Sequence, residues 1–302
     1  MNPSLKQQPL IRQGWLRVLL FCISYFILQV AAVLLSLLFL KQVNKESAQN
    51  LDGLLNGKFL WLAIVVNLLI ALLVISCFLK WIDKKPWSSL GFGTAGYFKQ
   101  ASAGLLLSFS MLGTGALLMY FSHHLRWDDI QFSVNDLFIA FGMTLLIAIY
   151  EESVFRGYIL GNLMVSFNKW TSVLISAALF TIFHLANPGA GFVPLLNIFL
   201  AGVLLGTNYV YTRNLWFSIL FHLGWNFFQG AILGFKVSGL KLGSLLQMTL
   251  KGDLLLTGGE FGFEGSVFDS MISVIVIVLL LWIYERKFSP GGIRKSTSQV
   301  VI

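Results

Sequence analysis

The hydrophobic pattern of this chain is a series of long apolar runs, each followed by a short polar segment. Runs of about 20 apolar residues are typical of helices that cross a membrane. Spans are expected at residues 16–40, 59–82, 101–121, 136–165, 170–185, 193–212, 215–234 and 267–285. The pattern therefore predicts an all-α fold, a polytopic membrane helical bundle with about eight transmembrane helices, in one multi-pass domain over residues 1–302.

Two of the apolar runs depart from the usual length. The run at 136–165 is too long for one straight span, so it is expected to bend or to project beyond the membrane. The run at 170–185 is short and ends at Asn187-Pro188-Gly189, a combination that breaks helices. Neither run is therefore expected to be one regular, straight crossing of the bilayer.

Two polar segments differ in the order that is expected of them. The loop 235–266 is long and Gly-rich, and its Phe261 and Phe263 would be costly to expose to water. Ordered turns are therefore expected in this loop. The tail 289–302 is polar and begins with Pro290-Gly291, so it is expected to be a flexible cytoplasmic tail.

Composition and charge support the membrane assignment. The chain is 57% hydrophobic and 11% charged, whereas soluble domains carry about 25% charged residues. Its net charge of +8 does not indicate nucleic acid, because the basic residues lie in short loops beside apolar runs. With the N-terminus inside, thirteen Lys and Arg residues face the cytoplasm and seven face outward. This asymmetry predicts a cell-membrane protein with both termini in the cytoplasm and the lipid bilayer as its surroundings.

Three charged residues lie close together within the run 136–165. Glu152 and Arg156 are four residues apart with the acid first, which is the favourable order for a helical ion pair. Glu151 lies about 100° around the helix from Glu152 and has no local cation. An unpaired carboxyl group in apolar surroundings is suited to general acid–base chemistry. The spacing therefore assigns Glu152 and Arg156 to support of a site and Glu151 to chemistry.

Further polar side chains lie in two later spans. His184 is near the end of 170–185, and His222 and Asn226 are four apart on one face of 215–234, with Gly224 between them allowing close approach of another helix. Glu, His and Asn side chains supply the base, water positioner and oxyanion stabiliser that amide hydrolysis needs. At 1.5 Å per residue, Glu151 and His184 lie roughly 20 Å from the cytoplasmic ends of their spans and His222 roughly 10 Å. Tilt or a bend has to close that gap.

Each of these polar groups also has a purely structural explanation. Polar side chains in spans often join helices by hydrogen bonds, which would account for His184, and for His222 with Asn226. The Glu151-Glu152-x-x-x-Arg156 run is alternatively an internal salt-bridge network. The combination of all three motifs in one chain favours a functional site.

The three motifs together resemble the CPBP family of intramembrane proteases, which comprises CAAX proteases and bacteriocin-processing enzymes. They are Glu151-Glu152-x-x-x-Arg156, Phe180-x-x-x-His184 and His222-x-x-x-Asn226. The resemblance covers about 137–230, the expected catalytic core, and it extends to Ras-converting CAAX prenyl endopeptidases and Abi proteins. It implies that Glu151 activates a water held by His184, that His222 and Asn226 stabilise the oxyanion, and that Glu152 and Arg156 brace the site.

The resemblance implies an intramembrane endopeptidase that cleaves a peptide or protein segment presented at the membrane, either prenylated or a leader peptide. Two alternatives remain open. One is a proton-coupled transporter that uses Glu151 and the two histidines as a relay. The other is a catalytically silent membrane interaction protein. The sequence predicts no oligomeric state.

A bound metal is a further open question. If zinc is present, Glu151, His184 and His222 would hold it, and the family is often labelled metalloprotease. The HExxH motif is absent, and Asn226 beside His222 suits an oxyanion hole better than a metal sphere. A metal-free, glutamate-dependent hydrolase is therefore the favoured hypothesis.

Overall fold

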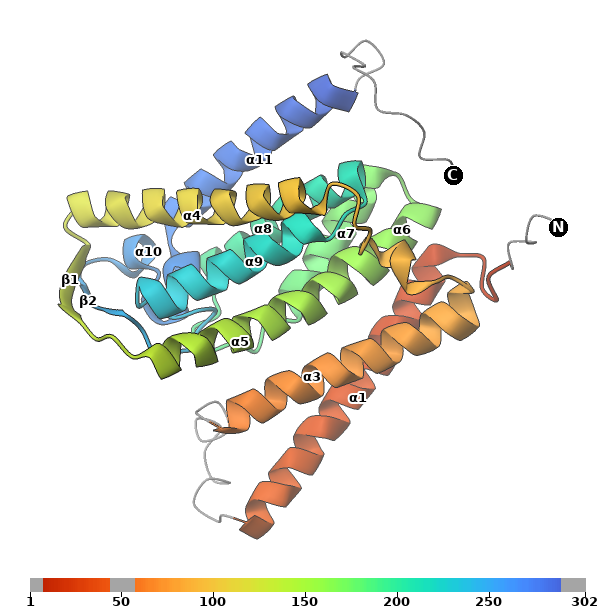
Figure 1. Cartoon of the computed structure of the whole chain (residues 1–302), viewed down its shortest axis with the longest axis horizontal. Helices are drawn as coiled ribbons and strands as arrows, with labels where there is room; N and C mark the ends of the chain where they lie inside the picture. The colour runs from red at the N-terminus through yellow and green to blue at the C-terminus, as the bar shows by residue number, and fades with distance from the viewer. Residues whose placement is uncertain (1–7, 44–57, 289–302) are drawn as a thin grey trace.

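The computed structural model describes residues 8–43 and 58–288 (Figure 1). The tail 289–302 lies outside this part of the chain. The helices are α1 (Gly14–Val43), α3 (Lys58–Cys77), α4 (Tyr97–Phe121), α5 (Val134–Glu152), α6 (Gly161–Ser166), α7 (Lys169–Ile182), α8 (Phe192–Thr212), α9 (Trp216–Phe227), α10 (Leu254–Thr257) and α11 (Val267–Phe288). The π-helices are η1 (Phe78–Asp83), η3 (Ser153–Leu160) and η4 (Phe228–Ile232), the 3-10 helices η2 (Trp87–Leu90), η5 (Gly259–Phe261) and η6 (Phe263–Gly265), and the strands β1 (Leu125–Ile130) and β2 (Leu246–Leu250).

Helices stand at all eight positions where the hydrophobic pattern predicts spans, which confirms the all-helical membrane fold. Within the described residues, six helices are long and apolar enough to cross a membrane. They are Gly14–Ser36, Leu60–Asp83, Tyr97–Phe121, Val134–Ser166, Phe192–Thr212 and Val267–Phe288. The other two are shorter than a full crossing, since α7 has 14 residues and α9, with 12, is extended by only the 5 residues of η4.

The long fourth run is one continuous helix of 33 residues, Val134–Ser166, with an irregular middle. Its first part, α5, passes at Glu152 into the π-helix η3, which in turn passes into α6. A π-helix bonds i to i+5, so it widens the turn and alters which side chains share a face. The excess length of the run therefore coincides with a π segment directly after the two glutamates.

Helix α9 occupies the middle of the bundle beside α4 and α5 (Figure 1). Two glycines allow its close approach to α4, since a Cβ at Gly104 would overlap the Phe217 carbonyl and one at Gly224 would overlap the Ser108 hydroxyl. Small residues permit such backbone contact between helices in membranes. The role that the sequence predicts for Gly224 is confirmed.

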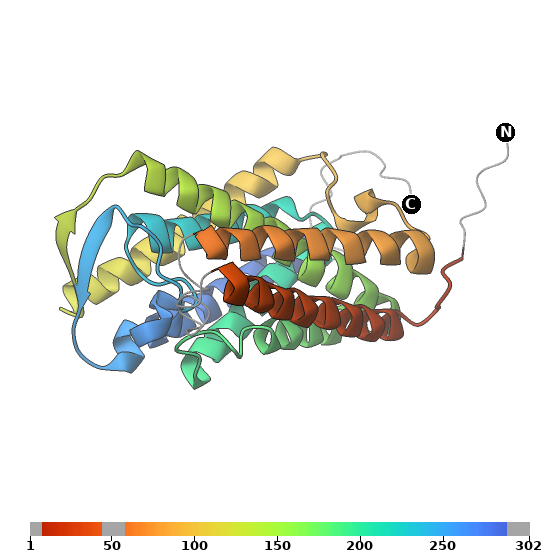
Figure 2. The ribbon, with the colours of Figure 1, turned by 90° about the horizontal axis from the view of Figure 1, so that it is seen from below.

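The N-terminal hairpin of α1 and α3 covers one side of the bundle (Figure 2). A buried cluster fixes it to the η3–α6 helix. Arg17 donates to Asp83 at 3.0 Å and to Asn162 at 3.0 Å, and the Tyr158 hydroxyl donates to the second oxygen of Asp83 at 2.8 Å. Buried charges are tolerated when they are paired and hydrogen-bonded in this way.

At the opposite end of the bundle, the loop after α9 folds back on the structure. Strand β2 of this loop pairs antiparallel with β1, and Phe261 and Phe263 are fully buried. The expectation of ordered turns is confirmed. The loop also contacts the chain after α7, because Gly239 lies so close to Pro188 that a Cβ would overlap its carbonyl. The loop therefore supports the turn that carries His184.

Candidate active site

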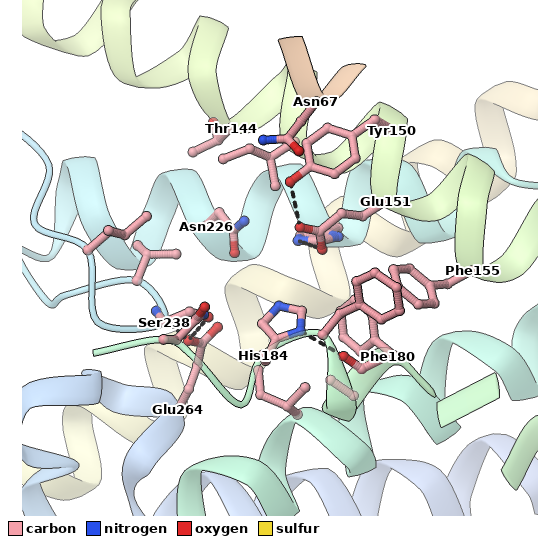
Figure 3. Close-up of a pocket in the computed structure, with 18 of the residues that line it drawn as sticks. Asn67, Thr144, Tyr150, Glu151, Phe155, Phe180, His184, Asn226, Ser238 and Glu264 are labelled. Atoms are coloured by element: carbon pink, nitrogen blue, oxygen red, sulfur yellow. Dashed lines mark hydrogen bonds and ion pairs between the residues drawn. The ribbon is translucent and has the colours of Figure 1, made fainter. Parts of the chain in front are cut away.

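The polar side chains predicted from the sequence converge on one cavity of about 650 Å³, which is lined by residues of α1, α3, α4, α5, α7, α8, α9 and α11. Its walls are mostly apolar. Glu151, His184, His222 and Asn226 all line it, and Figure 3 shows Glu151, His184 and Asn226 around a common space. The side chains of Glu151, His184 and His222 therefore reach the same cavity, although their positions along their separate spans differ.

Glu151 lies in the last turn of α5, and its carboxylate is only partly used. Its Oε1 accepts a hydrogen bond of 3.0 Å from the Tyr150 hydroxyl (Figure 3). Its Oε2 is buried, has no hydrogen-bond partner among the described residues, and lies 3.8 Å from His222 Nε2. No lysine or arginine in that part of the chain forms an ion pair with it. An oxygen of this kind is available to accept a proton.

Glu152 is fully buried and contacts two basic side chains through one oxygen. Its Oε1 accepts from Arg156 Nη1 at 2.8 Å and lies 2.9 Å from His222 Nδ1. The predicted pair with Arg156 is confirmed. Because an ionised carboxylate only accepts hydrogen bonds, His222 Nδ1 carries the proton in this contact. Glu152 thus orients His222 so that Nε2 is directed to Glu151.

Arg156 is buried and is stabilised by more than its partner glutamate. Its guanidinium lies 4.5 Å from the centroid of the Phe180 ring, a cation–π distance. Phe180 also precedes His184 by one helical turn and contacts its ring. The glutamate motif of α5 and the histidine motif of α7 are therefore joined through one aromatic ring.

His184 lies in the turn that follows α7, which ends at Ile182. Its Nδ1 is 2.8 Å from the Phe180 carbonyl oxygen. A carbonyl only accepts, so Nδ1 carries the proton and the neutral ring leaves Nε2 as an acceptor. The ring faces the cavity (Figure 3). The turns that begin after Ile182 continue into the breaker residues 187–189, so His184 lies in a turn and not on a regular helix.

Asn226 lies one turn beyond His222 on α9. It is 6% exposed, and its side-chain amide makes no hydrogen bond within the described residues. A buried amide without a partner is uncommon. The side chain points into the cavity (Figure 3). It can therefore donate to an oxygen of a bound molecule.

The three possible zinc ligands have side chains of the right type for zinc, but they are not arranged around a common point that a metal ion could occupy. Glu151, His184 and His222 are ligand types that zinc accepts, and each histidine has its Nδ1 fixed by a carbonyl or carboxylate, as in zinc sites. However, no group of three His, Cys, Asp or Glu side chains among the described residues is arranged to hold a metal ion.

Three cavity residues were not identified from the sequence. Tyr150 bonds Glu151, and Glu264 and Asp269 line the far part of the cavity. Glu264 lies in the loop where ordered turns are predicted, yet nothing in that pattern singles out its side chain. Asp269 does carry a signal, because an ionisable residue inside an apolar run is a functional candidate by the same reasoning that identified Glu151.

Residues 133–228 match a family model described as Rce1-like, Type II CAAX prenyl endopeptidase Rce1-like. The match contains all six site residues predicted from the sequence, and it confirms the resemblance to CPBP proteases over this segment. An Rce1-like domain supports a peptidase of the CAAX type that is embedded in a membrane and acts on peptides or proteins. Among curated proteins, none matches the chain.

Proposed function

We propose that this protein is an intramembrane endopeptidase in which Glu151 activates a water for attack on a peptide bond. The observation that supports this most directly is the unpartnered, buried Oε2 of Glu151, whose side chain lines the same cavity as His184, His222 and Asn226. A buried acceptor beside an empty volume large enough for water and a peptide backbone suits a general base.

Each step of the proposed reaction uses a side chain that lines the cavity. Glu151 Oε2 takes a proton from water while the water oxygen bonds to the carbonyl carbon. His184 Nε2 accepts a hydrogen bond from the other O–H of this water and so holds the water in place. The amide nitrogen of Asn226 and Nε2 of His222 donate to the oxyanion. Glu151 then returns the proton to the leaving amine as the C–N bond breaks.

His222 can donate from Nε2 only if both ring nitrogens carry protons, since Nδ1 already donates to Glu152. In the proposed mechanism His222 is therefore an imidazolium whose charge is balanced by Glu152 at 2.9 Å and Glu151 at 3.8 Å. Arg156 pairs with Glu152 at 2.8 Å and holds it in place. Glu152 and Arg156 are thus positioning residues.

The proposed mechanism operates without a metal. This is supported by the spacing of Glu151, His184 and His222, which do not come together as a ligand group. Cleavage that survives exhaustive treatment with a zinc chelator is expected. Loss of cleavage in chelator and its return on adding zinc would replace this mechanism with a metal-dependent one.

The proposed substrate is a peptide segment presented at the membrane, with a prenylated CAAX-type chain favoured by the family match and a leader peptide as the alternative. The mostly apolar cavity wall suits a lipid-modified chain. A proteomic comparison of membranes with and without the protein distinguishes the two, because only one class carries a thioether-linked lipid at the processed end.

We further propose a cell-membrane location with both termini in the cytoplasm. The start of α1, the α3–α4 connection and the end of α11 lie at the same end of the bundle in Figure 1. That end carries Lys80, Lys84, Lys85, Arg286 and Lys287, as expected for a cytoplasmic face. Labelling of single cysteines placed at the two ends by a membrane-impermeant reagent tests this orientation.

The test of the proposed function is cleavage of a reporter peptide by the purified protein in detergent. The Glu151→Ala variant is expected to lose cleavage while keeping its gel-filtration profile and unfolding temperature. Full activity of a folded Glu151→Ala protein would disprove the mechanism. A change in proteoliposome ion flux without any proteolysis would favour the transporter alternative.

A further inference from the structure

A second polar region lies in the same cavity, away from Glu151. It consists of Glu264, at the end of the loop before α11, and Asp269, in the first turn of α11. Glu264 is 6% exposed and Asp269 is 3% exposed. In Figure 3 Glu264 lies on the other side of Asn226 and His184 from Glu151. The cavity therefore has acidic groups at two places.

No cation balances this second region. Neither Glu264 nor Asp269 forms an ion pair within residues 8–43 and 58–288. The lysine nearest in the loop, Lys236, pairs with Glu260, and neither of these lines the cavity. Two carboxyl groups buried near one another without a cation cannot both be ionised without cost, so either one of them is protonated or a bound group supplies a positive charge.

Hydrogen bonds within the protein account for only part of this region. Glu264 accepts from the Trp225 indole nitrogen at 3.0 Å, and from the backbone amide and hydroxyl of Ser238, both at 2.8 Å. Asp269 accepts from the Ser273 hydroxyl at 3.0 Å through one oxygen. Its other oxygen has no hydrogen bond among the described residues. Asp269 lines the cavity, so this oxygen is available to a bound group.

The acidic region is held close to the proposed oxyanion site. Trp225, whose indole fixes Glu264, directly precedes Asn226 on α9. An extended peptide advances about 3.3 Å per residue. A substrate with its reacting carbonyl at Asn226 would therefore bring a side chain only a few residues away to Glu264 and Asp269.

We infer that Glu264 and Asp269 form a specificity subsite for a lysine or arginine side chain of the peptide substrate. The inference rests on the proposed function. A basic side chain supplies the missing positive charge and donors for the free Asp269 oxygen, and its aliphatic stem lies along apolar wall residues. A bare metal ion fits less well, because hard cations need six or more oxygen ligands and Glu264 already uses its oxygens within the protein.

The test is a series of reporter peptides in which one lysine is moved along positions on both sides of the scissile bond. Norleucine at the same position is the matched neutral peptide. The wild-type protein is expected to show a kcat/KM ratio of lysine to norleucine of about tenfold or more at one position. Glu264→Gln and Asp269→Asn are each expected to bring that ratio close to one.

The control variant is Glu260→Gln, which alters an exposed carboxylate in the same loop. Its side chain is 78% exposed and pairs with Lys236 outside the cavity. This variant should keep the lysine preference. A preference that is absent at every position in the wild type, or that persists in both Glu264→Gln and Asp269→Asn, overturns the subsite.

Failure of the proposed function has a different signature. If the wild-type protein cleaves none of the peptides, catalysis is disproved, and the subsite is then tested by binding of the same fluorescent peptides to the wild-type protein. Tighter binding of the lysine peptide, weakened by Asp269→Asn, supports the subsite. Equal binding of the lysine and norleucine peptides overturns it.

Discussion

Two buried ion pairs contact the same continuous helix, and they differ in how completely their polar atoms are used. In the first pair, which we call the clamp, Arg17 donates to Asp83, to Asn162 and to two backbone carbonyls, and the Tyr158 hydroxyl donates to the remaining oxygen of Asp83. In the second pair, Glu152 with Arg156, Glu152 and its neighbour Glu151 each keep a buried oxygen without a partner among the described residues.

This difference distinguishes structure from chemistry better than charge alone. A buried pair that only joins helices gains stability by satisfying every donor and acceptor. A site that must accept a proton or bind a substrate has to leave atoms unsatisfied in the resting state, at a cost in stability. The clamp fits the first description, and the Glu152–Arg156 pair with the adjacent Glu151 fits the second.

The largest effect on kcat is expected from removing the charge of Glu151 without changing the shape of its side chain. Glu151→Gln should lower kcat by about 10²–10⁴, the usual contribution of a general base. Its unfolding temperature in detergent should stay close to that of the wild type, because the amide keeps the shape of the carboxylate and Glu152 still balances the charge of His222 at 2.9 Å. A variant that unfolds more easily while retaining turnover would reverse the assignment of Glu151.

Asp83→Asn should have the opposite effect. It leaves Arg17 buried with a weaker partner, so the free energy of unfolding should fall by about 3–5 kcal/mol, whereas kcat of the folded fraction should be unchanged. Denaturant titration followed by far-UV circular dichroism measures the loss. Replacing both partners, as Arg17→Met with Asp83→Leu, should recover much of the stability. No recovery in this double variant would mean that the pair does more than join helices.

The two ion pairs also show which contacts can be predicted from the sequence and which cannot. Glu152 and Arg156 are four residues apart on one helix, so spacing alone identifies them. Arg17 and Asp83 are 66 residues apart, and no local pattern relates them. The fold class follows from apolar run lengths, because the requirement to satisfy the backbone in lipid leaves little choice.

The remaining site residues show the same limit. The residue types of His184 and His222 indicate the chemistry that they can perform. That they share a cavity depends on the close packing of α4 against α9 and on the turn after α7. Glu264 reaches that cavity because Ser238 and Trp225 hold its carboxylate. Contacts of this kind depend on the whole fold, and no periodic pattern in the sequence predicts them.

Glu152 has both a structural role, as the partner of Arg156, and a role in the proposed catalysis, because it orients His222. Its substitution is expected to separate the two roles. Glu152→Gln should lower kcat by about 10–100-fold through misorientation of His222, a range typical of residues that orient an active group. It should also lower stability, since Arg156 loses its counter-ion. Adding Arg156→Met should restore the unfolding temperature but not kcat. Recovery of both quantities together would make Glu152 a purely structural residue.

A smaller effect is expected from the helix contact that places Asn226. A Cβ at Gly224 would overlap the Ser108 hydroxyl and approach Leu105 on α4, so Gly224→Ala should cost about 1–3 kcal/mol of stability and lower kcat as α9 shifts. Ser108→Ala in the same chain should recover part of both losses. Wild-type stability and turnover in Gly224→Ala would show that the contact does not set the position of Asn226.

The smallest effect is expected from the only hydrogen bond that Glu151 makes within the described part of the chain. Tyr150→Phe removes the hydroxyl that donates to Glu151 Oε1 at 3.0 Å and leaves the ring in place. One such bond contributes about 0.5–1.5 kcal/mol, so kcat should change by about two- to tenfold. The direction is informative. A fall means that the hydroxyl holds Glu151 in its reactive position, whereas a rise means that the bond restrains the carboxylate as a base. An unchanged kcat, measured on peptide at saturation, would show that Glu151 is positioned by the α5–η3 backbone alone.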